Sequence, residues 1–377
     1  PQSRGWVLVC DHWIPAPDRD SGSLRMRELI RLLRRLGHRV TFFSAHENPR
    51  EPYETALQAA GVEVQRGLGR FAGFCEGRAG LYDRVILSRP HVARAMIDDV
   101  RRHFPDAAVV YDTVDLQYQR EGRRLALAGL DRGPEYAEMV DEEHRLQRAA
   151  DITVAITEVE AEILREGVPG STVHVVPNVH VLEPEPIPGF ELRHGLLFIG
   201  GFAHEPNVDA VVHFVTEVLP LVTCEEDLRF FILGSDPPAR VMELQSAKVV
   251  VTGYVADVRP YFAATRVFVA PLRYGAGMKG KVGQAMAHGL PLVSSTIGAE
   301  GMNLEDGRDG FIVDDPAGFA RAALRLHRDQ DLWERMSRRG REVVAQRWTP
   351  EVVEPQVAAL MTACVGVRNL RTAANHG

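Results

Sequence analysis

Lysine is scarce in this chain of 377 residues. Only Lys248, Lys279 and Lys281 are lysines among the 44 basic residues, and the other 41 are arginines. Such a bias usually follows genome composition and by itself excludes no function. Two of the three lysines nevertheless lie within three positions of one another, which marks that place for closer examination.

Cysteines are few, and long apolar runs are absent. The four cysteines lie far apart and form no CxxC pair: Cys10, Cys75, Cys224 and Cys364. This disfavours a disulfide scaffold or a zinc module and fits a reducing cytosol. No apolar run approaches 18 residues, so no transmembrane helix is expected. The first six residues do not have the pattern of a signal peptide. We therefore expect a cytoplasmic location, with peripheral membrane contact left open.

An excess of positive charge is also missing. The net charge is −7, from 51 acidic against 44 basic residues, which disfavours a nucleic-acid partner. The chain has no HExxH pair, no GxSxG elbow, no Walker motif, and no GxGxxG after its first expected strand. We accordingly expect no metal ion, no bound cofactor and no dehydrogenase chemistry.

Short apolar runs alternate with helical patterns through the first half. The expected strands are 6–10, 39–44, 62–64, 84–88, 107–112 and 152–156, and the clearest helical patterns are 24–36, 91–102 and 135–149. Apolar strands that alternate with helices predict a parallel sheet covered on both faces.

The pattern breaks at residues 183–189 (EPEPIPG), a linker rich in proline, and then restarts. The second set of expected strands is 196–200, 228–234, 249–251, 267–271 and 292–294, with helices at 208–215, 282–288, 316–328 and 332–346. We predict an α/β protein of two doubly wound domains, 1–182 and 183–348, that face a cleft. The segment 349–377 would hold a helix at 351–364 and fray after 366.

The turn 270–284 carries the strongest signal. Gly275, Gly277 and Gly280 allow backbone to approach a ligand, and the following helix start attracts anions. Lys279 and Lys281 add two cations, which we expect to be exposed on a loop that offers little packing. Together they predict a diphosphate site. The alternative is a flexible loop with solvated lysines.

Three other turns follow strands. After the strand 196–200, Gly200 and Gly201 would allow the backbone to approach a phosphate or sugar closely. His204 is either a ligand contact or a loop residue. In 15–23, Ser21 or Ser23 would cap the next helix, with Gly22 at the cleft mouth and Arg25 facing the same region. Each of these turns could also be structural only.

The third turn, 112–121, holds two carboxylates and an Arg–Glu pair. Asp112 and Asp115 would be costly in a core and are more natural in a polar site, although they could also cap turns. Arg89, at the end of the strand 84–88, would lie nearby.

These motifs resemble those of GT-B glycosyltransferases, specifically the retaining, nucleotide-sugar-dependent family 4. The resemblance covers nearly the whole chain, through PAPDRDSGSLR, VVPNV, LLFIGGF, TGYVADV and APLRYGAGMKGK…QAMAHGLPLVSS. It implies a donor site made by Gly200, Gly201, Phe202, Gly253, Tyr254, Gly275, Ala276, Gly277, Met278 and Gln284. It places an acceptor cleft at Ser21, Gly22, Arg25, Arg89 and His204. It also implies a final helix that crosses back to the first domain.

The chain departs from the family pattern at several positions. Gln284 and Ala276 stand where the family usually has glutamates, while Gly201 and Asn207 stand where it has a phosphate-binding arginine and lysine. Gln117 stands where relatives often have histidine. Lys279 and Lys281 are then the replacement cations.

The resemblance implies retaining transfer of a sugar from a nucleotide-diphosphate sugar to an acceptor hydroxyl. Lys279 and Lys281 would stabilise the leaving diphosphate, while Asp115, Gln117 and Arg120 would orient the sugar or acceptor. Three alternatives remain: a nucleotide-sugar-binding protein with weakened catalysis, a nucleotide-sugar epimerase, and a non-enzymatic scaffold. The acceptor loop is expected at 65–82, where Phe71 and Phe74, with Tyr53, would either stack on an acceptor or pack locally.

Overall fold

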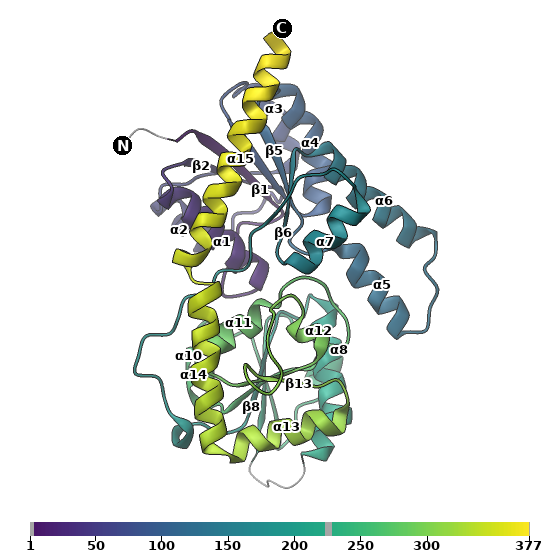
Figure 1. The fold of residues 1–377 in the computed structure, drawn as a ribbon, viewed down its shortest axis with the longest axis vertical. Coiled ribbons are helices and arrows are strands. Elements are labelled where there is room, and N and C mark those ends of the chain that lie inside the picture. Colours follow the sequence, from purple (N-terminus) through teal and green to yellow (C-terminus); the bar gives the residue numbers. More distant parts are fainter. Residues whose placement is uncertain (1–3, 223–227, 377) are drawn as a thin grey trace.

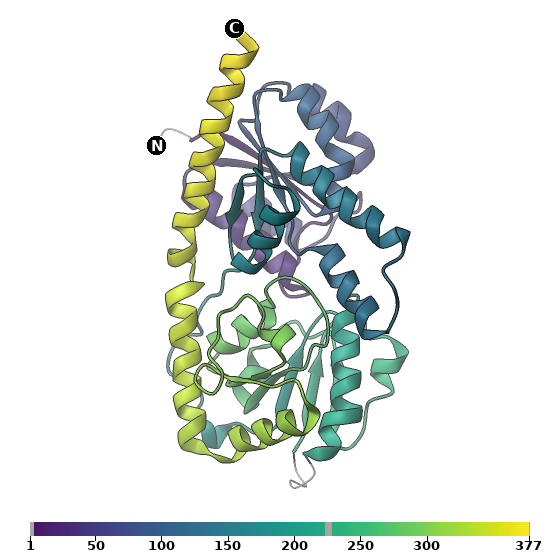
Figure 2. The ribbon, with the colours of Figure 1, turned by 45° about the vertical axis from the view of Figure 1, so that its right-hand side comes forward.

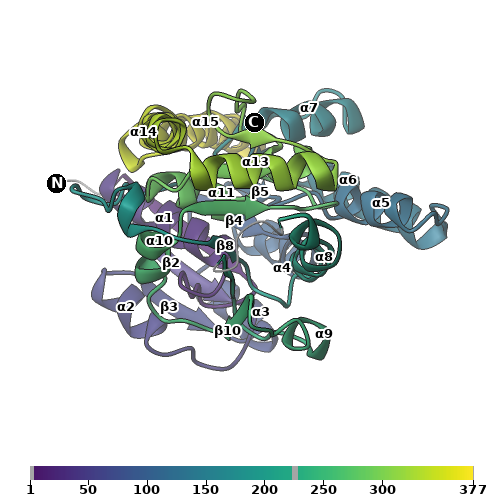
Figure 3. The same cartoon turned by 90° about the horizontal axis from the view of Figure 1, so that it is seen from below.

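The structure, a computed structural model, describes residues 4–222 and 228–376. Two parallel sheets lie one above the other, each with helices on both faces (Figures 1 and 3). The chain between β7 and β8, residues 176–195, links them and contains the proline-rich segment. This is the predicted α/β architecture of two doubly wound domains.

The first sheet has the strand order β3-β2-β1-β4-β5-β6-β7. Its strands are β1 (Trp6–Asp11), β2 (Arg39–Ser44), β3 (Glu63–Arg66), β4 (Arg84–Ser88), β5 (Ala108–Asp112), β6 (Ile152–Ala155) and β7 (Val173–Val175). Its helices are α1 (Ser21–Arg35), α2 (Tyr53–Ala59), α3 (Phe71–Glu76), α4 (Pro90–His103), α5 (Gln117–Leu127), α6 (Pro134–Ala149) and α7 (Glu158–Gly167), with a 3₁₀ turn at Leu68–Arg70.

The second sheet has the order β10-β9-β8-β11-β12-β13. Its strands are β8 (Leu196–Ile199), β9 (Phe230–Leu233), β10 (Val249–Gly253), β11 (Val267–Ala270), β12 (Leu292–Ser294) and β13 (Phe311–Ile312). Its helices are α8 (Glu205–His213), α9 (Ala239–Met242), α10 (Arg259–Ala264), α11 (Gly280–Ala287), α12 (Thr296–Ala299), α13 (Pro316–Arg328) and α14 (Gln330–Arg347). A π-helical turn, Phe214–Val218, continues α8, and 3₁₀ turns lie at Phe190–Leu192 and Leu219–Leu221.

The strand orders place a ligand site between the domains. In each sheet the winding reverses once, between β1 and β4 and between β8 and β11. Loops that leave neighbouring strands in opposite directions open a crevice at such a switch point, at the carboxyl ends of the strands. Residues that follow β1 and β4 line one pocket together with residues that follow β8 and β11, so the two switch points face each other across the domain boundary.

The C-terminal helix α15 (Pro350–His376) crosses back to the first domain, as expected (Figure 2). Its buried residues Val353, Val357, Leu360, Met361 and Cys364 join the core formed by α1 and the first sheet. The expected fraying after residue 366 is wrong, because the helix continues to His376. Arg371 on the last turns donates to Asp151 at 2.6 Å, which anchors this extension to the first domain.

Candidate functional site

A cleft of about 470 Å³ lies between the two switch points. Residues after β1, β4 and β5 line it from the first domain, and residues after β8, β9, β10 and β11 line it from the second. The cleft is therefore lined by strand-to-helix turns from both sheets. These are the turns in which the sequence predicted binding and catalytic residues.

The glycine–lysine loop, residues 271–280, connects β11 to α11. The expectation of an exposed, loosely packed loop is wrong, because every residue in it except Arg273 is buried. Lys279 is only 8% exposed, and its Nζ donates to the carbonyl of Ala276 at 3.0 Å and of Gly277 at 2.5 Å. Burial lowers the Lys279 pKa, while Glu300 and Glu160 oppose the shift. Lys279 thus holds the loop's own backbone in shape.

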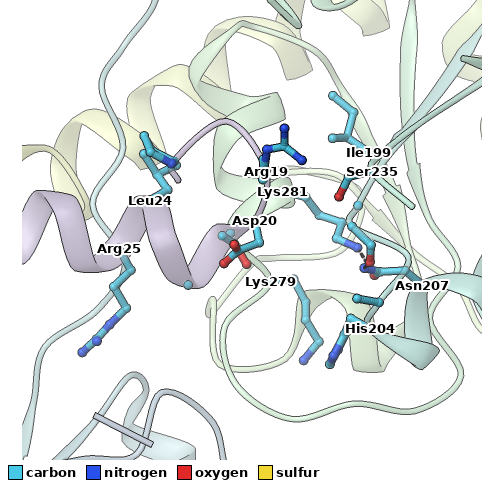
Figure 4. A pocket seen from close by; sticks show the side chains of 18 of the residues that line it. Arg19, Asp20, Leu24, Arg25, Ile199, His204, Asn207, Ser235, Lys279 and Lys281 are labelled. Atoms are coloured by element: carbon cyan, nitrogen blue, oxygen red, sulfur yellow. Dashed lines mark hydrogen bonds between the residues drawn. The ribbon is translucent and has the colours of Figure 1, made fainter. Parts of the chain in front are cut away.

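Lys281 lies on the first turn of α11 and enters the cleft beside Asn207 (Figure 4). Its ammonium donates to Oδ1 of Asn207 and lies 4.4 Å from the centre of the Phe198 ring. Burial, with a smaller effect from Lys279, lowers its pKa to about 7. Asn207 stands where the family pattern has a lysine, so Lys281 brings an ammonium to that place from another element.

Gly200 faces these two side chains. A Cβ at Gly200 would lie 2.8 Å from the Lys281 Nζ and 2.7 Å from the Asn207 Nδ2. A larger residue here would displace the end of one or both of these side chains, so the glycine after β8 shapes the cation site.

The other expected donor-site residues divide into two groups. Gly200, Gly201, Tyr254, Ala276, Gly277, Met278 and Gln284 line the cleft, as does His204 at the start of α8. Gly253 and Gly275 are not among the lining residues, and the Phe202 ring is buried in the second-domain core. The Tyr254 hydroxyl donates to Asp18 of the first domain, and Arg19 lies over its ring at 4.5 Å.

On the first-domain side, the expected helix cap is wrong. Asp20, not a serine, caps α1 by accepting from the Ser23 amide at 2.7 Å. Ser21 and Gly22 still line the cleft. Ser21 lies against the second domain, because a Cβ on Gly280 would be 2.9 Å from its own.

Asp112 has a structural role, whereas its partner Arg25 lines the cleft, as predicted. Asp112 is 1% exposed and pairs with the equally buried Arg25 at 2.8 Å, and Ser88 donates to the same carboxylate. The expectation that Asp112 needs a polar site is therefore wrong, because Arg25 compensates its charge. Arg89 forms an ion pair with Asp11 at 2.7 Å and lines the cleft, as predicted.

Asp115 and Arg120 form an ion pair at the cleft, whereas Gln117 does not line it. Val114, just before this pair, has a φ of +64°, which is rare for a β-branched residue. The carbonyl of Val114 and the side chain of Asp115 both lie against Gly277 of the second domain.

Two buried glutamates, one from α6 and one from α7, hold the start of α5, whose N-cap residue Leu116 makes no side-chain cap of its own. Glu143 accepts from the Tyr118 amide at 3.0 Å, and Glu160 from the Leu116 amide at 3.4 Å. Burial raises the Glu143 pKa to about 8, and burial with nearby Asp115 raises that of Glu160. These carboxyl groups fix the helix that carries Arg120 towards the cleft.

The sequence reading missed Arg123 on α5. Its guanidinium donates to the Gly275 carbonyl at 2.7 Å and pairs with Glu300 of the second domain at 2.5 Å. No local pattern could reveal this contact, because the partners are more than 150 residues away in the chain.

In the expected acceptor segment the aromatic residues pack locally. Phe71 is 1% exposed and packs edge-to-face on Phe43, while the Tyr53 hydroxyl donates to Asp18 at 2.8 Å. Phe74 packs against the same group. Trp13, which the sequence reading did not select, lines the cleft and stacks on His46.

Within residues 4–222 and 228–376, no cluster of three or more histidine, cysteine or acidic side chains fits a metal ion. No helix in that part of the chain is long and apolar enough to cross a membrane. Cys10, Cys75 and Cys364 are buried free thiols, while Cys224 lies outside the described residues.

Two doubly wound domains that face one cleft, with a C-terminal helix returning to the first, define the GT-B fold of glycosyltransferases. Residues 193–329, most of the second domain, match the family described as Glycosyl transferases group 1.

Comparisons along the whole chain support this fold. Sucrose-phosphate synthase from Thermosynechococcus elongatus has a TM-score of 0.72 and 16% identity, covering 96% of this chain and 100% of that one. HepE from Anabaena, solved with UDP and glucose, has a TM-score of 0.71 and 14% identity over 96% and 100%.

A curated relative matches over a shorter stretch. The lipopolysaccharide core biosynthesis glycosyltransferase LpsE of Rhizobium meliloti is 29% identical over 120 residues. The match covers 31% of this chain and 35% of that protein, so it spans about a third of the relative's length.

Proposed function

We propose that the protein transfers a sugar from a nucleotide-diphosphate sugar to an acceptor hydroxyl. The observation that carries this proposal is the meeting of Lys281, the start of α11 and Gly200 at a cleft that the first domain closes from the other side. The family match over 193–329 and a structural neighbour solved with UDP and glucose support it. The domains 1–182 and 183–348 would hold acceptor and donor respectively, with 349–377 completing the first.

The second domain offers positive potential where a diphosphate would lie. Four backbone amides at the start of a helix have no partner within that helix, and the helix dipole adds partial positive charge. Lys281, on the first turn of α11, adds an ammonium that pairs with no carboxylate among the described residues. An anion bound at this place would favour the charged form of Lys281, which burial disfavours.

We infer retention at the transferred carbon from the resemblance to family 4. The acceptor oxygen would form its bond on the face from which the diphosphate leaves. The acceptor proton would pass to a phosphate oxygen of the leaving group. Lys281 and the start of α11 would stabilise the charge that develops there, which is commonly the largest catalytic effect. Asp115 and Arg120 would orient the sugar or acceptor, and no metal ion is required in this scheme.

Calorimetric titration with UDP, dTDP, GDP and ADP tests the donor site. We expect one nucleotide to bind the wild type selectively and to lose at least about tenfold in affinity in the Lys279→Ala/Lys281→Ala variant. Absence of binding by all four nucleotides would overturn the proposal. If one binds, the sugar nucleotide of that base is then incubated with acceptors, and the anomeric configuration of the product tests retention.

A second candidate is a protein that binds a nucleotide sugar but transfers it poorly. Ala276 and Gln284, which both line the cleft, favour it because the family has carboxylates there. Binding without transfer or hydrolysis of the donor would support this candidate.

Gln284→Glu tests whether this position holds the donor. A carboxylate forms stronger hydrogen bonds to hydroxyls than a neutral amide, so we expect about fivefold tighter nucleotide binding. Gln58→Glu, an exposed position on α2, adds the same charge away from the cleft and is the control. Weaker binding in Gln284→Glu than in Gln58→Glu would show that no donor hydroxyl lies at this position.

A further inference from the structure

Helix α5 leaves the first domain and reaches the second (Figures 1 and 2). Arg123 makes the contact at its middle. Its Nη1 donates to the Gly275 carbonyl and to Glu300 Oε2, both at 2.7 Å, and its Nη2 donates to Glu300 Oε1 at 2.5 Å. The Arg123 side chain is three-quarters buried, so these bonds are largely shielded from water.

Gly275, Ala276 and Gly277 are three consecutive residues, and the backbone carbonyl of each accepts a hydrogen bond from a cationic side chain. Arg123 holds the carbonyl of Gly275, and Lys279 holds those of Ala276 and Gly277. Lys279 belongs to the loop itself, so its bonds travel with the second domain. Arg123 belongs to the first domain, so its bond exists only while the domains are in contact.

Glu300 makes this contact specific. It is the C-cap residue of α12. Each of its two carboxylate oxygens accepts a hydrogen bond from one terminal nitrogen of the Arg123 guanidinium. A carboxylate bound at two points fixes the plane of an arginine side chain. The fixed guanidinium can then aim its remaining bond at the Gly275 carbonyl.

We propose that Arg123 is a positioning residue that couples domain closure to the conformation of the glycine–lysine loop. When the domains close, Arg123 restrains Gly275, which has a φ of +151°, and thereby sets the residues that lead to Lys281 and the start of α11. When they open, the loop loses one of its three cation-held carbonyls. The catalytic consequence rests on the proposed function, whereas the coupling itself does not.

The chain supplies a matched control on the same helix. Arg124 is the next residue, but its two hydrogen bonds go to Glu121 of α5 itself. Arg123→Gln and Glu300→Gln remove opposite sides of the bridge, while Arg124→Gln removes the same charge without touching the bridge. Thermal unfolding of all three variants shows whether each is folded.

Hydrogen exchange and small-angle scattering test the coupling without any substrate. In Arg123→Gln we expect amide exchange in residues 275–280 to rise about tenfold and the radius of gyration to increase. Glu300→Gln should change both in the same direction, and Arg124→Gln should match the wild type. Equal behaviour of Arg123→Gln and Arg124→Gln would overturn the proposal, even if the protein proves to be an active transferase.

Kinetics test the consequence for transfer. We expect Arg123→Gln to lower kcat about tenfold while KM for the donor changes less than about threefold, because the bridge acts on the closed form. Should the wild type bind no nucleotide, the proposed function fails, but the exchange and scattering results still decide the coupling. An unchanged kcat in a variant with faster exchange would overturn the role in positioning.

Discussion

Replacing Lys281 with methionine is expected to lower turnover by about 100-fold or more while leaving the protein at least as stable. The lost ammonium is the cation we place on the leaving diphosphate, and losing one such donor commonly costs about 10²–10³-fold in rate. Methionine loses the hydrogen bond to Asn207 and the contact of the ammonium with the Phe198 ring, but it also removes the cost of burying that ammonium, which lowers the Lys281 pKa to about 7, so stability should not fall. Turnover of the donor and the free energy of unfolding are the measurements.

Lys248 provides the control, since it is the third lysine of the chain, does not line the cleft and is exposed next to the start of β10. Lys248→Met should leave both quantities unchanged. If Lys281→Met lost stability and activity in proportion, Lys281 would be a structural residue and the diphosphate site would lie elsewhere.

The same lysine predicts how stability varies with pH. Its pKa is about 7 in the folded protein and lies near the ordinary 10.5 when unfolded. Between these values the unfolded chain binds more protons, so this residue makes stability rise with pH from about 7 to 10.5. Lys281→Met should remove that rise. In the wild type at about pH 8, nucleotide binding should take up protons, which calorimetry in buffers of different ionisation enthalpy detects.

Gly277→Ala is expected to reduce turnover about tenfold for a different reason. The new Cβ would lie 3.2 Å from the Asp115 Cβ and in ordinary contact with the Val114 carbonyl at 3.4 Å, so Asp115 of the first domain would have to move slightly at the cleft. A displacement of about 1 Å can cost on the order of 100-fold in rate, and we expect a smaller loss for this smaller shift. The φ of +68° adds roughly 1 kcal/mol of destabilisation.

Gly129→Ala separates these two effects. Gly129 has a φ of +65°, and no atom lies within 4 Å of the place that a Cβ would take, so alanine there brings backbone strain alone. Both variants should lose similar stability, measured by denaturant unfolding, but only Gly277→Ala should lose turnover. Equal turnover in the two would show that the contact between Gly277 and Asp115 is unimportant for catalysis.

Local patterns predict the two sheets well, because the spacing of apolar residues in a strand or helix follows directly from which side chains are buried. The strands expected at 39–44, 84–88 and 292–294 have those bounds in the structure. The glycine–lysine loop is also visible in the sequence, since glycines after a buried strand are a local feature.

The details that depend on distant contacts could not be predicted. Asp112 was expected at a polar site because its partner, Arg25, lies 87 residues away in the chain. Lys279 was expected in solvent because the sequence does not show that the first domain covers its loop. Arg123 was missed for the same reason. Its role depends on the ion pair with Glu300, which lies far away in the sequence.

The return of α15 determines the order in which the protein can be completed during synthesis. Val353, Val357, Leu360 and Met361 cover the first-domain core, yet the ribosome makes them after the entire second domain. Domains generally fold as units during synthesis, the N-terminal one first. Here part of the first-domain core stays uncovered until α15 is made, so that core can be completed only after the whole second domain has been synthesised.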